Sequence, residues 1–141
     1  MGKRDALKEF VLAVNKRYPL RFAVLFGSRA RGDALKSSDY DILLVSEYFK
    51  GNVIQRISEV LKLWKEKEAL EPICFTLEEF EAGTRGYNTI VWESLKEGKP
   101  IYGANEFMKY KAVFEKAKRL GLIEVLPTTI RFKKSPESIF G

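Results

Sequence analysis

The chain has 141 residues, of which 45% are hydrophobic and 31% are charged, and it carries a formal net charge of +6 with no histidine. This length and composition are typical of one compact domain with a buried core, and they argue against general disorder. The absence of histidine excludes histidine-dependent catalytic triads, while the single cysteine excludes an internal disulfide and argues against a zinc site.

The first half of the chain alternates between helical and strand-like patterns. Residues 6–18 place apolar side chains at helical spacing, so they predict an amphipathic helix. Apolar runs at residues 21–26 and 40–46 predict two strands on either side of a Gly-Ser turn. Asn52 is predicted to cap a long helix to about residue 67, whose buried stripe would contain Ile54, Ile57, Leu61 and Trp64.

The pattern continues with a third strand at residues 70–75, which contains the cysteine, Cys74, as a predicted core residue. Thr76 and Glu79 have the spacing of a capping box, which opens a short helix to about residue 82. A further helix is predicted over residues 87–96, where the following glycine ends it.

The last third of the chain contains one more helix and a less regular end. Residues 100–102 predict a short edge strand, because proline is tolerated at a sheet edge. Asn105 is predicted to cap a helix that ends at Leu120. Residues 122–126 and 128–132 are strand-like around Pro127, and the sequence leaves open whether this end frays, packs on a subunit or contacts nucleic acid.

These elements together predict the fold class α/β (α+β), with a small mixed sheet and helices packed against it. We expect the main domain to span residues 1–121 and a C-terminal arm or tail to span residues 122–141. No apolar stretch approaches the roughly 20 residues that cross a bilayer, and no apolar h-region follows the charged N-terminus. The sequence therefore predicts a cytoplasmic protein without membrane contact.

Two aspartates begin the second predicted strand. Because side chains alternate along a strand, Asp39 and Asp41 should point the same way and Tyr40 the opposite way. Two carboxylates placed in this way can share two metal ions held roughly 3.5–4 Å apart, the separation used in phosphoryl transfer. An exposed Asp-x-Asp in a loop is the alternative, and the apolar strand that follows at once argues against it.

The Gly-Ser turn complements these carboxylates. Gly27 permits a tight turn and close approach of a ligand, and Ser28 is predicted to cap a short helix that begins at Arg29. Arg29 and Arg31 add positive charge, and Gly32 would end that helix. An ordinary strand-turn-helix corner is the alternative interpretation of the turn alone.

The segment is not a Walker P-loop. Gly27 and Gly32 have the required spacing, but Asp33 and Ala34 stand where lysine and serine or threonine are needed. The chain also contains no G-x-G-x-x-G dinucleotide motif.

The order Gly27-Ser28, ten residues, Asp39-x-Asp41 resembles the signature of the DNA polymerase beta-like nucleotidyltransferases. The longer segment from Phe26 to Ile42 resembles the minimal nucleotidyltransferase branch of this superfamily. The kanamycin nucleotidyltransferases share the same fold. The resemblance implies transfer of AMP from ATP, or of another nucleoside monophosphate, to a hydroxyl with two Mg²⁺ ions.

The resemblance also implies roles for individual residues. Gly27 and Ser28 would hold the terminal phosphates of the nucleotide, and Asp39 and Asp41 would bind the metal ions. The basic residues expected to contact phosphates or the acceptor are Arg29, Arg31 and Lys36.

A third carboxylate is expected from a neighbouring strand. Glu71, at the start of the third predicted strand, is the candidate for a catalytic and metal-binding role. A solvent-exposed strand-entry carboxylate is the alternative for Glu71, and the poorer choices for the role are Glu68, Glu78 and Glu79.

Minimal nucleotidyltransferases of prokaryotes are often antitoxins with a helical partner of the HEPN type, so the resemblance implies such a partner as the acceptor. A binding module that neutralises its partner without catalysis is one alternative. A small-molecule or RNA nucleotidyltransferase is another, although nucleic acid is not the favoured partner. The sequence leaves a homo-oligomer open.

Overall fold

The structure is a computed structural model, which describes residues 3–32, 39–127 and 129–136. Lys36, one of the predicted nucleotide-binding residues, lies outside the described residues, as do Asp33 and Ala34. Within the described part of the chain, no helix combines the length and the apolar character needed to cross a membrane.

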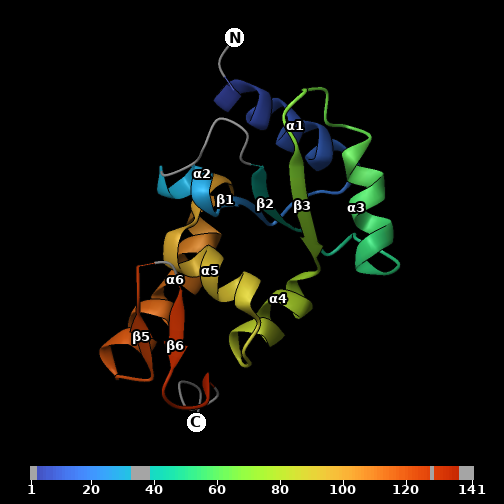
Figure 1. The fold of residues 1–141 in the computed structure, drawn as a ribbon. Coiled ribbons are helices and arrows are strands. Elements are labelled where there is room, and N and C mark those ends of the chain that lie inside the picture. The colour runs from blue at the N-terminus through green and yellow to red at the C-terminus, as the bar shows by residue number, and fades with distance from the viewer. Residues whose placement is uncertain (1–2, 33–38, 128, 137–141) are drawn as a thin grey trace.

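A four-stranded mixed sheet forms the centre of the fold (Figure 1). Its strand order is β3-β2-β1-β4, with β1 antiparallel to β2 and to β4, and β2 parallel to β3. The strands are β1 (Phe22–Phe26), β2 (Tyr40–Val45), β3 (Leu70–Phe75) and β4 (Lys99–Tyr102). Pro72 and Pro100 lie in the two edge strands, where the missing N–H costs least. The predicted mixed sheet is confirmed.

Helices cover both faces of this sheet (Figure 1). One face packs against α1 and α3, and the other packs against α4, α5 and α6. A short helix, α2, follows β1 directly. The helices are α1 (Lys3–Arg17), α2 (Ser28–Arg31), α3 (Val53–Leu61), α4 (Leu77–Thr84), α5 (Thr89–Glu97) and α6 (Ala104–Arg119).

Strand alternation divides the interior into two cores. In β2, Ile42 and Leu44 face the α1 side, whereas Leu43 and Val45 face the α5 side, and all four are fully buried. This two-sided burial explains why β2 is an almost unbroken apolar run rather than an alternating one. The predicted core position of Cys74 is confirmed, because its side chain is buried with the α1 side.

A two-stranded hairpin of β5 (Ile123–Val125) and β6 (Ile130–Phe132) follows α6. Leu122 and Ile123 are buried in the core that α5 and α6 share. The ring of Phe132 meets the rings of Trp92 and Tyr87 edge-on, with centroids 5.4 and 5.0 Å apart. The division of the chain at residue 121 remains a prediction.

The third helix differs from its prediction in length and in its buried face. The Asn52 cap is confirmed, but α3 ends at Leu61 instead of near residue 67, and Ile54 is 78% exposed. The helix instead buries Val60 and Arg56, whose guanidinium donates to the Cys74 carbonyl (3.2 Å) and to Glu79 (2.6 Å). Arg56 therefore lies on the buried face of α3, a position that apolar periodicity does not reveal.

Two other helix starts also differ from the predictions. Gly103, with φ of 68°, precedes α6, so the predicted Asn105 cap is wrong. A Cβ at Gly103 would lie 2.9 Å from the Phe22 Cα, so close backbone packing decides where this helix begins. The helix predicted from residue 87 begins at Thr89, capped by the Asn88 side chain. The capping box of Thr76 and Glu79 is confirmed.

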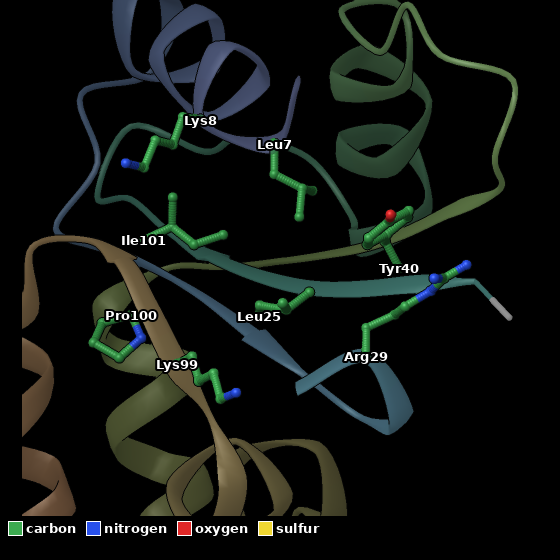
Figure 2. A pocket seen from close by; sticks show the side chains of 8 residues that line it. All are labelled: Leu7, Lys8, Leu25, Arg29, Tyr40, Lys99, Pro100 and Ile101. Carbon is green, nitrogen blue, oxygen red and sulfur yellow. The ribbon is translucent and has the colours of Figure 1, made fainter. Parts of the chain in front are cut away.

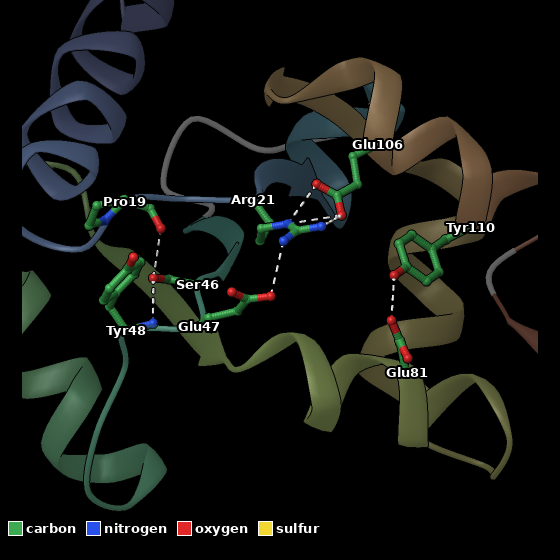
Figure 3. Close-up of polar contacts among 8 residues, drawn as sticks. All are labelled: Pro19, Arg21, Ser46, Glu47, Tyr48, Glu81, Glu106 and Tyr110. Carbon is green, nitrogen blue, oxygen red and sulfur yellow. Dashed lines mark hydrogen bonds and ion pairs between the residues drawn. The ribbon is translucent and has the colours of Figure 1, made fainter.

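Polar contacts fix the end of the sheet at which β1 begins and β2 ends (Figure 3). Arg21 donates to Glu106 of α6 and to Glu47, which follows β2. Nearby, the Tyr110 hydroxyl donates to Glu81 at 2.8 Å, and burial raises the pKa of Tyr110. The contacts of Arg21 join α6 to the strand ends opposite the aspartates, and the Tyr110–Glu81 hydrogen bond joins α6 to α4.

Candidate active site

The structure brings the three predicted carboxylates together at one end of the sheet. Asp41 of β2 stands opposite Glu71 of β3 in the parallel register, and Asp39 lies two residues before Asp41. Side chains at matched positions on adjacent strands lie on the same face of a sheet. Glu71 accordingly makes side-chain hydrogen bonds with both aspartates.

In this acidic cluster the pKa values of Glu71 and Asp41 are raised. Hydrogen bonds with Asp41 and then Asp39, together with burial and the negative charges of both aspartates, raise the pKa of Glu71 to about 7. Burial also raises the pKa of Asp41, which the charge of Arg31 opposes. A bound cation would offset the repulsion among three carboxylates this close.

The Gly27 turn packs directly against the Asp41 side chain. Phe26, the residue before the turn, pairs with Asp41 across the antiparallel strands β1 and β2. Gly27 has φ of 75° and ψ of −160°, a region that essentially only glycine occupies. A Cβ at this position would overlap Oδ2 of Asp41 and lie 3.2 Å from its Cγ. The two halves of the sequence motif therefore touch.

The short helix α2 begins one residue earlier than predicted. Gly27 occupies the position before the helix, and its carbonyl accepts hydrogen bonds from the N–H groups of Ala30 and Arg31, each at 3.1 Å. Ser28 is therefore the first helical residue, and its predicted role as a cap for a helix from Arg29 is wrong. The prediction that Gly32 ends the helix is confirmed by its left-handed conformation.

Glu97, the last residue of α5, is a site residue that the sequence did not reveal. Its side chain is only 8% exposed, and it accepts a hydrogen bond of 3.0 Å from the Gly27 N–H. The same carboxylate forms an ion pair with Arg31, with distances of 2.9 and 3.1 Å. Glu97 thus connects both ends of α2 to α5. The contact joins residues about 70 positions apart in the sequence, and no local sequence pattern predicts it.

Replacing Glu97 by alanine is expected to lower the free energy of unfolding by about 2 kcal/mol, because hydrogen bonds to charged groups contribute on that scale. Glu97→Gln should lose less than half as much, since an amide oxygen still accepts from the Gly27 N–H. Urea unfolding measures both changes, with Glu66→Ala at an exposed position as the control. Equal stability of the Glu97→Ala and Glu66→Ala variants would contradict this role.

The predicted basic residues do not all face the carboxylates. Arg31 lies on their side of the sheet, paired with Glu97. The guanidinium of Arg29 instead lies 4.5 Å from the ring centroid of Tyr40, whose side chain packs on the α1 face (Figure 2). Arg29 and Asp41 are therefore associated with opposite faces of the sheet.

The donor chemistry at this edge fits a hard divalent cation. Asp39, Asp41 and Glu71 offer carboxylate oxygens only, the ligands that Mg²⁺ prefers. Among residues 3–32, 39–127 and 129–136, no group of three Asp, Glu, Cys or His side chains is already arranged around a single metal position. The carboxylates instead hydrogen bond to one another, and a bound cation would replace those bonds.

Comparison with known proteins identifies the family to which the chain belongs. A family model described as a nucleotidyltransferase domain matches residues 7–97 of the chain. A curated protein of Methanocaldococcus jannaschii, provisionally named a protein adenylyltransferase, is 41% identical over 63 residues. That alignment covers 43% of this chain, and the chain spans 63% of the length of that relative.

Two solved structures show weaker overall likeness. One is a provisionally assigned nucleotidyltransferase of Sulfolobus solfataricus, with 34% identity and a TM-score of 0.47 over 56% of this chain and 71% of that chain. The other is a toxin-antitoxin structure with AMP-PNP, with 12% identity and a TM-score of 0.46 over 80% of this chain and 94% of that chain. The family model covers more than half of the sequence and includes the Gly-Ser turn and all three carboxylates, so the chain belongs to the nucleotidyltransferase domain family.

Proposed function

We propose that this protein transfers AMP from ATP to a hydroxyl group in a Mg²⁺-dependent reaction. The observation that carries the proposal is the packing of the Gly27 turn on Asp41, at the edge where Glu71 and Asp39 converge. The turn that we propose for the phosphates therefore lies beside the carboxylates that we propose as metal ligands, and membership of the nucleotidyltransferase family supports the same reaction.

Each residue has a role in this reaction. Asp39, Asp41 and Glu71 would hold two Mg²⁺ ions, which supply Lewis-acid neutralisation of the triphosphate charge. Gly27 and Ser28 would contact the terminal phosphates, and Arg31 on the same side of the sheet would add a positive charge.

In the chemical step, the acceptor oxygen forms a bond to the α-phosphorus as the bond to pyrophosphate breaks. The proton of the acceptor hydroxyl passes to a carboxylate at this edge, and Glu71 is the candidate because its side chain is the exposed member of the pair with Asp41.

The acceptor that we propose is a hydroxyl on a partner protein. The name of the Methanocaldococcus jannaschii relative, a protein adenylyltransferase, supports a protein acceptor. A HEPN-type toxin as the partner, with this chain as the antitoxin, follows from the sequence resemblance and stays a prediction, as does the cytoplasmic location.

Transfer of a labelled nucleotide tests this function. The full chain is incubated with Mg²⁺, ATP labelled at the α-phosphate, and a HEPN-type protein as the proposed partner. We expect the label on the partner with the wild-type chain, and none with the Asp39→Ala/Asp41→Ala variant or after chelation of the metal.

Equal labelling by wild type and the double variant would contradict the assignment. A stable complex without any label would favour the non-catalytic binding module. Label on added RNA or on a free aminoglycoside without the partner would replace the protein acceptor.

A further inference from the structure

Two of the donors that we propose for the nucleotide phosphates are occupied by a side chain of the protein itself. The Gly27 N–H donates to Oε1 of Glu97 at 3.0 Å. The guanidinium of Arg31 lies 2.9 and 3.1 Å from the two carboxylate oxygens of the same glutamate. A backbone N–H and a guanidinium are also the donors that bind phosphate oxygens in proteins. The Glu97 carboxylate therefore has the contacts that a phosphate group would make.

The position of this carboxylate is unfavourable apart from these contacts. Glu97 is the last residue of α5, where the helix macrodipole disfavours a negative charge. Its side chain is nearly buried, and a buried ion is costly unless it is paired. Glu93 lies one turn earlier, and burial followed by the charge of Glu97 raises the pKa of Glu93. The bonds to Gly27 and Arg31 offset these costs.

The backbone that carries Glu97 is held firmly. Gly98 follows α5, and its N–H donates to the Ser94 carbonyl at 2.8 Å. A Cβ at Gly98 would overlap both that carbonyl oxygen and the side chain of Val24 in β1. The end of α5 therefore packs closely against the sheet. The Glu97 carboxylate could leave the turn by rotation of its own side chain, without movement of the helix.

We propose that Glu97 is an internal stand-in for phosphate, which holds the Gly27 N–H and Arg31 in the empty site and yields them to the terminal phosphates of the nucleotide. This inference rests on the proposed function, because it takes the Gly27 turn as the phosphate site. Without Glu97, the partly buried Gly27 N–H would lack an acceptor in the empty protein, which costs free energy. The stand-in therefore keeps the turn formed before the nucleotide binds.

The same contacts make Glu97 a competitor of the nucleotide. A carboxylate and a phosphate need the same donors, and their like charges repel at close range. On binding, phosphate oxygens replace the carboxylate oxygens, and the carboxylate returns as pyrophosphate leaves. Glu97 should therefore weaken the binding of ATP and of pyrophosphate alike. Product release limits the turnover of many enzymes, and a competitor within the site would speed that step.

Calorimetric titration of the full chain tests this role, with Mg²⁺ and a non-hydrolysable ATP analogue as the probe. We expect the Glu97→Gln variant to bind the analogue about tenfold more tightly than the wild type. The reason is that a neutral amide makes weaker hydrogen bonds than a carboxylate and does not repel phosphate. Inorganic pyrophosphate with Mg²⁺ should show the same gain in affinity.

The NMR signal of the Gly27 amide gives a second readout, which a merely structural role would not produce. In the free chains this signal should differ between the wild type and Glu97→Gln, because the acceptor differs. With saturating analogue the two signals should coincide, since a phosphate oxygen is then the acceptor in both chains. The spectrum of the free variant also shows whether it is folded.

Glu93→Gln is the matched control, because it removes the same charge one turn earlier in α5 and leaves the Glu97 contacts in place. It should change the affinity for the analogue by less than about threefold. Equal or weaker binding by Glu97→Gln than by the wild type would overturn the stand-in role and leave the proposed function standing. An equal gain in Glu93→Gln would also overturn it. If no chain binds the analogue, the proposed function fails, and this inference fails with it.

Discussion

Replacing Gly27 by alanine is expected to lower the free energy of unfolding by about 3 kcal/mol and the rate of nucleotide transfer by about 100-fold. The backbone at Gly27 occupies a region that costs a side-chain-bearing residue about 1–3 kcal/mol. The added Cβ would also collide with the Asp41 carboxylate, and overpacking costs a further 1–3 kcal/mol or so. Displacing Asp41, a proposed metal ligand, by about 1 Å is enough for a rate loss of that size. Urea unfolding and the labelled-transfer assay measure the two effects.

Gly121→Ala is the matched control for this variant. Gly121 also has a positive φ, of 71°, but a Cβ there would meet no atom within 4 Å. Gly121→Ala should therefore show only the backbone cost, about 1 kcal/mol, with unchanged transfer. If the Gly27→Ala and Gly121→Ala variants were equally stable and equally active, the predicted role of the contact between the turn and Asp41 would be contradicted.

Glu71→Gln is expected to lower transfer by about 100-fold while leaving the metal-free protein as stable as the wild type or more stable. The loss follows from removing one charged group from the set that would hold the metal ions, an effect comparable with other electrostatic contacts in active sites. The stability follows from relief of repulsion, since Glu71 crowds Asp41 and Asp39. A residue that an active site requires can therefore lower the stability of the metal-free protein.

A purely structural role for Glu71 would give the opposite pair of results. The variant would then be less stable and, when folded, as active as the wild type. Glu78→Gln is the matched control, because Glu78 is an exposed glutamate of α4 and lies just beyond the end of the same strand. It should change neither transfer nor stability.

The central sheet was predictable because each strand carries its own signal. β2 and β3 are apolar runs of strand length, and the proline in each edge strand is tolerated only at an edge. The convergence of Asp39 and Asp41 with the Gly27 turn was predictable too, because the motif spacing and strand alternation act locally. The placement of Glu71 beside Asp41 needed the parallel register of β2 and β3, which the sequence suggests but does not specify.

The remaining features depend on contacts between distant segments. In α3 the charged Arg56 is buried against Cys74 and Glu79 while the apolar Ile54 faces solvent, against the apolar periodicity. Glu97 reaches the Gly27 turn only because α5 packs beside β1. Arg29 and Arg31 lie two residues apart on a single helical turn, which directs them to different faces of the sheet. None of these contacts produces a local sequence pattern from which it could be predicted.

The most direct test of the central claim, that the Gly27 turn and three carboxylates form one metal-dependent nucleotide site, is a count of bound metal ions. Mn²⁺ replaces Mg²⁺ as a spectroscopic probe, and its binding is titrated by electron paramagnetic resonance with a non-hydrolysable ATP analogue present. The wild-type chain should bind two Mn²⁺ ions per chain, and only with the nucleotide. The Glu71→Gln variant should bind them more weakly, and Asp39→Ala/Asp41→Ala should bind none. Equal Mn²⁺ binding by the wild-type chain and the double aspartate variant would contradict the account.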